Sequence, residues 1–197
     1  MLPMSRISKL EGKVRALYEQ KLPTRGNWAD YLWSNHVLVV AEFASNLAKK
    51  YEVDEDLARA AALLHDIADA TMPRENPEHE QESLKIARDI MTELDYTEDD
   101  MKIVIDDALV HHSCHDDDRP ATQVGKILAT ADALAHLKTD FYILGVWLAG
   151  TEKDSYEKRK EWVTTKIERD YHNKILFEDE KLDTTHDYEI IKELFSR

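Results

Sequence analysis

Hydrophobic positions recur at helical spacing along most of the chain. Within residues 5–21, Ile7, Leu10, Val14 and Leu17 lie three or four residues apart, which is the spacing of one face of an α-helix. The next segment, residues 28–51, repeats the pattern over a broader apolar face. This periodicity predicts an all-α fold.

Capping residues indicate where several helices begin. Asp54 can cap an alanine-rich helix, and Thr97 with Asp100 resembles a capping box, in which side chains satisfy free backbone N–H groups. Together with the proline-rich breaks, these signals predict helices over residues 5–21, 28–51, 54–70, 78–94, 97–110, 122–136, 151–177 and 188–195. The tract FYILGVWLAG, residues 141–150, is apolar all round and is expected to be buried.

Length and composition fit a single helical domain over residues 1–197. The hydrophobic fraction of 43% supports one sizeable core, because chains of this length usually form one domain. Only five glycines and five prolines are present, which argues against a turn-rich β-sandwich or barrel.

Charge and missing motifs exclude several function classes. With 26 basic and 40 acidic residues the net charge is −14, which opposes binding to a nucleic-acid polymer. We expect no membrane span and no signal peptide, because no apolar run is long enough and residues 1–10 lack an apolar core. A lone cysteine, Cys114, excludes a disulfide framework. These features predict a cytoplasmic protein.

Histidine and aspartate on core-facing helical positions are the candidate chemistry. His36 interrupts an apolar face, His65 and Asp66 are adjacent on the alanine-rich helix, and Asp132 lies in a buried-type helix. Singly, His36 fits a hydrogen-bonded core histidine, and Asp132 fits a carboxylate bound to a helix end. Together they suggest one shared metal, because a buried carboxylate is costly unless it is paired or bound to a cation.

The order His36, His65–Asp66, Asp132 resembles the HD-domain metal-dependent phosphohydrolases. The resemblance covers residues 28–150. It implies an HD-domain helical bundle over that range and a C-terminal helical extension over residues 151–197.

A subset of that family has two further histidine ligands, and His79 matches the first of them. His112 is our choice for the second, with His111 as the alternative. The resemblance then implies two divalent metals per chain, of iron, manganese, cobalt or nickel. Asp66 would bridge them; the predicted ligands are His36, His65, Asp66, His79, His112 (or His111) and Asp132.

The resemblance implies hydrolysis of a phosphate ester or anhydride by a metal-activated water. The substrate would be a nucleotide or another small phosphorylated metabolite, and the residues expected at the reaction are Asp66, Asp69, His79 and His112. Asp69 would orient a ligand or a water. Some relatives instead hold a di-iron centre that works as an oxygenase, so that activity is an alternative.

Three departures from the family pattern suggest a further alternative, a non-catalytic ligand-binding module. Many relatives have cationic residues where this chain has Val39, Asp69 and Ala133. The residues that could replace those cations are Arg74, Lys126 and Arg119.

The remaining histidines fit surface or hydrogen-bonded roles: His115, His136, His172 and His186. His136 follows Asp132 by one helical turn and could orient it. The charged segment 151–174 is expected to be a solvated face or an oligomer contact.

Overall fold

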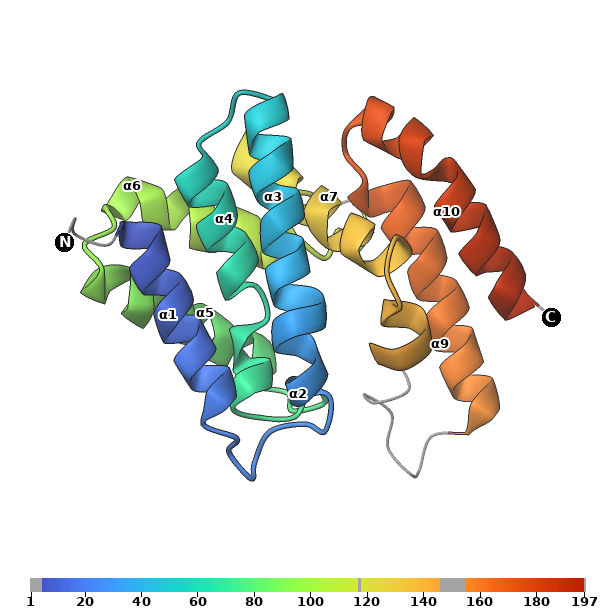
Figure 1. Cartoon of the computed structure of the whole chain (residues 1–197), viewed down its shortest axis with the longest axis horizontal. Coiled ribbons are helices and arrows are strands. Elements are labelled where there is room, and N and C mark those ends of the chain that lie inside the picture. The colour runs from blue at the N-terminus through green and yellow to red at the C-terminus, as the bar shows by residue number, and fades with distance from the viewer. Residues whose placement is uncertain (1–4, 117, 146–154, 197) are drawn as a thin grey trace.

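The computed structural model describes residues 5–116, 118–145 and 155–196, which form helices joined by loops (Figure 1). No strand occurs in these ranges, so the predicted all-α class is confirmed. The α-helices are α1 (Arg6–Glu19), α2 (Ala29–Leu32), α3 (Leu38–Lys50), α4 (Glu55–Leu64), α5 (His79–Glu93), α6 (Glu98–Met101), α7 (Gln123–Leu137), α9 (Tyr156–Arg169) and α10 (Glu178–Ser196).

Helix α3 lies at the centre of the bundle and packs against both α4 and α7 (Figure 1). Small buried residues such as Ala44, Ala61 and Ala131 let these helices approach closely. Helices α9 and α10 pack against each other, and α10 also contacts α7. The C-terminal pair therefore reaches the helix that carries Asp132.

The predicted caps are present. The Asp54 side chain accepts a hydrogen bond from the backbone N–H of Leu57 at 3.0 Å. Thr97 and Asp100 form a reciprocal capping box at the start of α6. These bonds satisfy N–H groups that have no partner inside the helix, so the sequence signal marks the true helix starts.

One predicted helix is too long, and the error lies at the candidate site. The alanine-rich helix ends at Leu64 instead of continuing to residue 70. His65 is extended, and Asp66 has a left-handed backbone with φ 54°. Aspartate tolerates this conformation better than most residues. A short 3-10 helix, Ile67–Ala70, follows, so His65 and Asp66 lie on a sharp corner and not on one helix.

Wider π-helical turns interrupt two of the helical runs. The segment Trp33–Val37 joins α2 to α3, and Lys102–Leu109 continues α6. Such turns are rare and often accompany functional sites. His36 lies within the first of them, with its side chain buried.

The tract at residues 141–150 is only partly as predicted. In the π-helical segment Phe141–Gly145, Phe141 and Tyr142 are buried, but Ile143 and Leu144 are 51% and 50% exposed. The prediction of complete burial is therefore wrong for these two residues, because only one side of the segment faces the core. Residues 146–150 of the tract, and the expected domain boundary at 150/151, lie outside the described residues.

The C-terminal helices also differ from the prediction. Helix α9 continues as a π-helical segment, Asp170–Lys174, and stops before residue 177. The last helix begins at Glu178 and not near Tyr188. Acidic residues in its first turn favour a helix N-terminus, and the polar Glu180 and Thr184 on its inner face hide the apolar periodicity.

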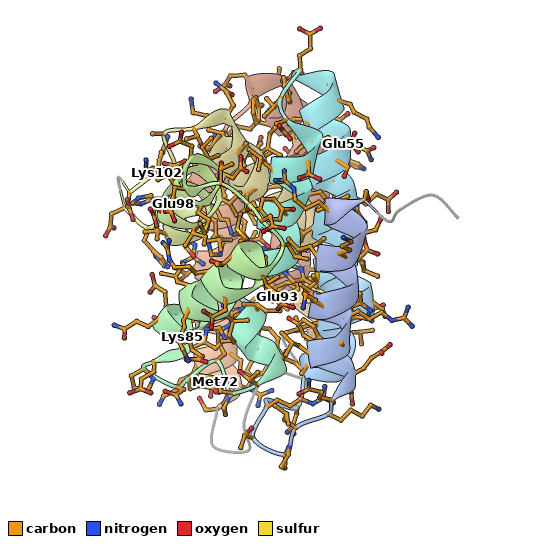
Figure 2. The ribbon with its side chains drawn as sticks, turned by 90° about the vertical axis from the view of Figure 1, so that its left-hand side faces the viewer. Glu55, Met72, Lys85, Glu93, Glu98 and Lys102 are labelled. Carbon is orange, nitrogen blue, oxygen red and sulfur yellow. The ribbon has the colours of Figure 1, made fainter. Side chains whose placement is uncertain are left out.

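Charged side chains cover the outer surface of α4, α5 and the α6 run. Glu55, Lys85, Glu98 and Lys102 are all exposed there (Figure 2). Across the part of the chain that the structure describes, no helix combines the length and apolar character needed to cross a membrane.

Candidate metal centre

Three residues from separate elements meet in the core: His36, His65 and Asp132. We call them the histidine cluster. His36 comes from the π-helical turn before α3, His65 from the corner after α4, and Asp132 from the middle of α7. All three are buried, with exposed fractions of 5%, 1% and 3%. The packing of α3 against α4 and α7 brings them together.

The ligand atoms of the histidine cluster are close enough to share an ion. His36 Nε2 lies 3.1 Å from His65 Nε2 and 3.3 Å from Asp132 Oδ1, and His65 Nε2 lies 3.8 Å from that oxygen. Atoms that bind one metal at about 2.0–2.2 Å must lie roughly 3 Å apart. Among the described residues, the cluster is the one group of three or more His, Cys, Asp or Glu side chains with such convergence.

Hydrogen bonding fixes which nitrogen of His65 faces the cluster. Its Nδ1–H donates to the carbonyl oxygen of Ala62 at 2.6 Å, which leaves Nε2 with a lone pair. Burial also lowers the pKa of His65 to about 4, so the ring is neutral near pH 7. A neutral imidazole with one nitrogen tied to a carbonyl is the usual state of a metal-ligating histidine.

His136 also turns a ring nitrogen that has a lone pair toward Asp132 Oδ1. Its Nδ1–H donates to Asp170 Oδ2 at 2.8 Å, while Nε2 lies 3.2 Å from Asp132 Oδ1. Burial lowers the pKa of His136 to about 3. The predicted contact of His136 with Asp132 is therefore present. Its role in orienting Asp132 stays a prediction.

The histidine cluster fits a cation because its acceptor atoms face one another. Asp132 Oδ1 is fully buried and has no hydrogen-bond partner among the described residues, and the same holds for His36 Nδ1. Neutral His65 and His136 each turn a ring nitrogen without a proton toward this oxygen, and such a nitrogen does not satisfy a carboxylate. An unpaired buried polar atom is costly. A divalent metal would satisfy Asp132 Oδ1 together with the ring nitrogens of His36 and His65.

The second oxygen of Asp132 is bound to Lys174. The Lys174 ammonium donates to Asp132 Oδ2, and only 2% of this lysine side chain is exposed. Burial is the largest single influence on Asp132 and by itself would raise its pKa. His136, Lys174 and His36 together outweigh it and hold the pKa of Asp132 well below its usual value. Asp132 is therefore ionised, with one oxygen neutralised and the other facing the ring nitrogens.

Lys174 belongs to a buried charge network that sequence analysis missed. Asp170, which is fully buried, contacts His136, Lys166, Lys174 and the Tyr142 hydroxyl. The end of the charged segment 151–174 therefore forms part of the site, and the prediction that this segment is a solvated face or an oligomer contact is wrong at the buried Lys166, Asp170 and Lys174. The spacing of Lys166, Asp170 and Lys174 puts them on one helical face, a signal that could have suggested a buried network.

A second group lies beyond the His65–Asp66 corner. Arg74 donates from Nη1 to Asp66 Oδ2 at 2.6 Å and from Nη2 to Asp69 Oδ2 at 2.7 Å. We call Asp66, Asp69 and Arg74 the arginine clamp. Asp69 is 1% exposed, and the Arg74 side chain is 38% exposed. Burial alone would raise the pKa of Asp66, but Arg74 and His112 bring it well below the usual value.

The two predicted additional histidines flank the arginine clamp. His79 Nε2 lies 3.0 Å from Asp69 Oδ1, and His112 Nε2 lies 3.8 Å from Asp66 Oδ2. His112 donates from Nδ1 to the Leu109 carbonyl at 2.7 Å. His111 instead pairs with Asp118 at 2.6 Å and does not line the cavity described next. The structure thus places His112, and not His111, beside Asp66.

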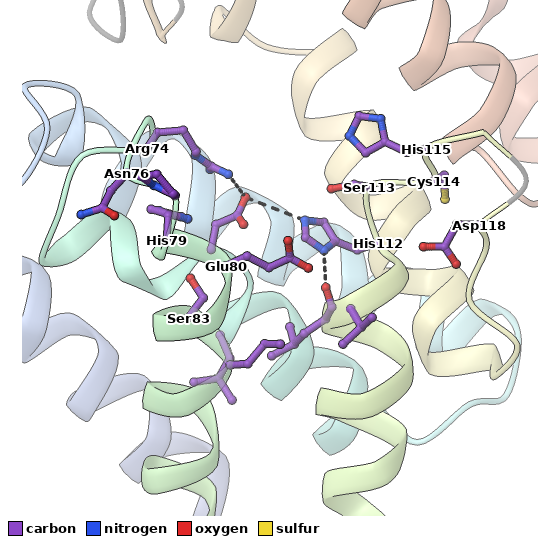
Figure 3. A pocket seen from close by; sticks show the side chains of 16 residues that line it. Arg74, Asn76, His79, Glu80, Ser83, His112, Ser113, Cys114, His115 and Asp118 are labelled. Carbon is purple, nitrogen blue, oxygen red and sulfur yellow. Dashed lines mark hydrogen bonds and ion pairs between the residues drawn. The ribbon is translucent and has the colours of Figure 1, made fainter.

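A cavity of about 450 Å³ opens over the arginine clamp (Figure 3). The clamp side chains Asp66 and Arg74 line it together with His79, Glu80 and His112, and dashed lines in Figure 3 mark the contacts of Asp66 with Arg74 and His112. The rings of His112 and His65 are 5.9 Å apart, so the cavity adjoins the histidine cluster. Of the three candidate replacement cations, Arg74 lines the cavity, whereas Lys126 and Arg119 do not.

The other histidines divide between the cavity and the surface. His115 is exposed but lines the cavity, and one of its ring nitrogens lies 3.1 Å from Arg169 Nη1. His172 and His186 are exposed, as predicted. Cys114 lines the cavity as a buried thiol, and burial raises its pKa.

The family model for the HD domain matches residues 33–137, which is more than half of the chain. The match begins in the π-helical turn that carries His36 and ends with α7, so it includes the whole histidine cluster and the arginine clamp. No curated protein and no solved structure matches the chain. With its His65–Asp66 pair and the matched range on either side of it, the chain belongs to the HD-domain superfamily of metal-dependent phosphohydrolases.

Proposed function

We propose that the protein is a metal-dependent phosphohydrolase acting on a nucleotide or another small phosphorylated metabolite. The observation that carries the proposal is the buried, unpartnered Oδ1 of Asp132, which faces the ring nitrogens of His36 and His65. This arrangement supports a divalent cation, and the HD-domain match supports hydrolytic chemistry.

A divalent metal supplies a Lewis acid that makes a water a competent nucleophile near neutral pH and offsets charge on phosphoryl oxygens. The chain's own residues prepare the site for it. The carbonyl of Ala62 keeps the proton of His65 on Nδ1, and Lys174 holds one oxygen of Asp132 so that the other faces the rings. Iron, manganese, cobalt and nickel all accept this nitrogen and oxygen ligand set.

The cavity supports a small substrate. Its volume of about 450 Å³ lies in the usual range for small-molecule sites, and the net charge of −14 opposes a polyanionic polymer. An anionic phosphate must therefore be attracted by positive charges inside the cavity, which a bound cation and Arg74 in the cavity wall would provide.

The test has two stages. Protein purified without chelator and without oxygen is analysed for metals, and then assayed for phosphate release from a panel of nucleotides and sugar phosphates. We expect bound iron or manganese, and hydrolysis that a chelator abolishes. A protein that takes up no metal after addition of Mn²⁺ or Fe²⁺ would contradict the proposal. Metal uptake with no turnover of any ester would favour a non-catalytic binding module.

A further inference from the structure

Arg74 binds Asp66, the residue that according to the resemblance would bridge to a second metal. Its two terminal nitrogens bind Asp66 and Asp69 at 2.6 and 2.7 Å, so the guanidinium bridges the two carboxylates. The arginine also lies over the indole of Trp28, with Cζ 5.3 Å from the ring centroid. Paired Arg–carboxylate bonds combine charge with fixed geometry, and the stacking on Trp28 holds the guanidinium in place.

Of the other predicted ligands of that second metal, His79 is also engaged. Both oxygens of Asp69 have partners, because Oδ2 binds Arg74 and Oδ1 lies 3.0 Å from His79 Nε2. An ionised carboxylate only accepts hydrogen bonds, so His79 must donate its Nε2–H to Asp69. A ring nitrogen that donates its proton has no lone pair for a metal.

The position of the guanidinium gives the same result. It is itself a cation, and it is bound directly to Asp66. A divalent ion bound to Asp66 would lie within a few ångströms of the guanidinium, where like charges repel strongly in a partly buried setting. The histidine cluster differs, because there the cation Lys174 binds Asp132 Oδ2 and leaves Oδ1 free.

We propose that Arg74 takes the place of a second metal ion, so that the chain holds one metal, in the histidine cluster. The inference rests on the proposed function, since it concerns the same site. Asp69 enables the exchange, because its carboxylate binds Arg74 and His79 together. The arginine then provides a permanent positive charge at the cavity wall, independent of metal supply.

Metal stoichiometry tests the inference without any assay of activity. Chelator-treated protein is titrated with Mn²⁺, and bound manganese is measured by calorimetry and by elemental analysis after desalting. Wild type is compared with Arg74→Gln and with the control Arg88→Gln, which removes a surface arginine paired with Asp106 at 2.8 Å. We expect about one equivalent in wild type and in the control, and about two in Arg74→Gln, because the variant frees the Asp66 oxygen that Arg74 holds and that His112 Nε2 faces.

The outcomes separate this inference from the proposed function. Two manganese ions in wild type would overturn the inference and leave the proposed function standing. One ion in a folded Arg74→Gln variant would also overturn it, because the arginine would not then be what excludes the second ion. No manganese in wild type would overturn the proposed function itself. If Arg74→Gln does not fold, anomalous scattering from manganese-soaked wild-type crystals decides, since one peak supports the inference and two peaks overturn it.

Discussion

The histidine cluster and the arginine clamp are adjacent and contain similar side chains, yet they neutralise their carboxylates differently. In the histidine cluster, Lys174 binds one oxygen of Asp132, and the other oxygen has no hydrogen-bond partner among the described residues. In the arginine clamp, Arg74 bridges Asp66 and Asp69, and His79 binds the oxygen of Asp69 that remains. The histidine cluster therefore has a carboxylate oxygen that a cation could bind, whereas in the arginine clamp the guanidinium already binds both carboxylates.

This difference shows that residue identity alone does not define a metal site. Aspartate occurs in both groups, but ligation also requires a lone pair that no other group occupies. A nearby arginine can occupy the carboxylate oxygens that a metal would need. The variants below test whether the two groups differ in this way.

The largest effect is expected at Asp132. Asp132→Asn should abolish metal binding and also destabilise the fold by about 3–5 kcal/mol, because it removes the carboxylate that accepts the hydrogen bond of the buried Lys174. Mn²⁺ titration and urea denaturation measure the two effects. The double variant Asp132→Asn with Lys174→Met should recover stability but not metal binding. Equal destabilisation in the single and double variants would show that the Asp132–Lys174 pair does not matter to stability.

Lys174→Met should be nearly as destabilising in the absence of metal. The substitution leaves the ionised Asp132 in the core, at a cost of about 3–5 kcal/mol, but it spares the metal ligands. Mn²⁺ should therefore raise the melting temperature more in this variant than in wild type, because the ion offsets the missing charge. Thermal denaturation with and without Mn²⁺ measures this.

A matched control for Lys174 is Lys102→Met. Lys102 pairs with Asp99 on the surface, where the two side chains are 66% and 88% exposed. Exposed pairs contribute about 0–1 kcal/mol, so this variant should melt close to wild type and respond to Mn²⁺ as wild type does. A similar loss in both lysine variants would contradict the special role of the buried one.

The third comparison is a pair of histidines, one from the histidine cluster and one beside the arginine clamp. His36→Ala should prevent manganese binding, because His36 Nε2 faces the unpartnered oxygen of Asp132. His79→Ala should bind about one equivalent of manganese, as wild type does, since the His79 ring donates to Asp69 and contributes no lone pair to a metal. Calorimetry with Mn²⁺ distinguishes them. Loss of an equivalent in His79→Ala would support the two-metal arrangement that the family resemblance implies.

Local signals predicted the helices and the residues of the histidine cluster. The caps at Asp54 and Thr97 depend on neighbours within three residues, so a short sequence pattern is enough to predict them. His36, His65 and Asp132 stood out because polar groups interrupt apolar faces. The corner at Asp66 could not be predicted in this way, because alanine-rich residues favour a continuing helix and only the tertiary fold selects the left-handed turn.

Long-range pairing explains what sequence analysis missed. Lys174 meets Asp132 only because the π-helical segment Asp170–Lys174 packs against α7, and no sequence signal near either residue indicates the other. The same holds for Arg74, whose role depends on where the loop before α5 folds back over Asp66. A charged helical segment suggests a solvated surface, and only the fold shows which of its charges are buried.

The smallest expected effect concerns Lys166, at the far end of the buried network from the histidine cluster. Burial lowers its pKa to about 8 from 10.5, so between these values the folded chain binds fewer protons at Lys166 than the unfolded chain does. Stability contributed through this group should therefore rise with pH across that window. Lys166→Met removes this contribution, so any stability advantage of the variant over wild type should shrink as the pH rises from about 8 to about 10. Urea denaturation of both proteins across this range measures it; a difference that stays constant with pH would show that Lys166 titrates normally and that its part of the network is open to water.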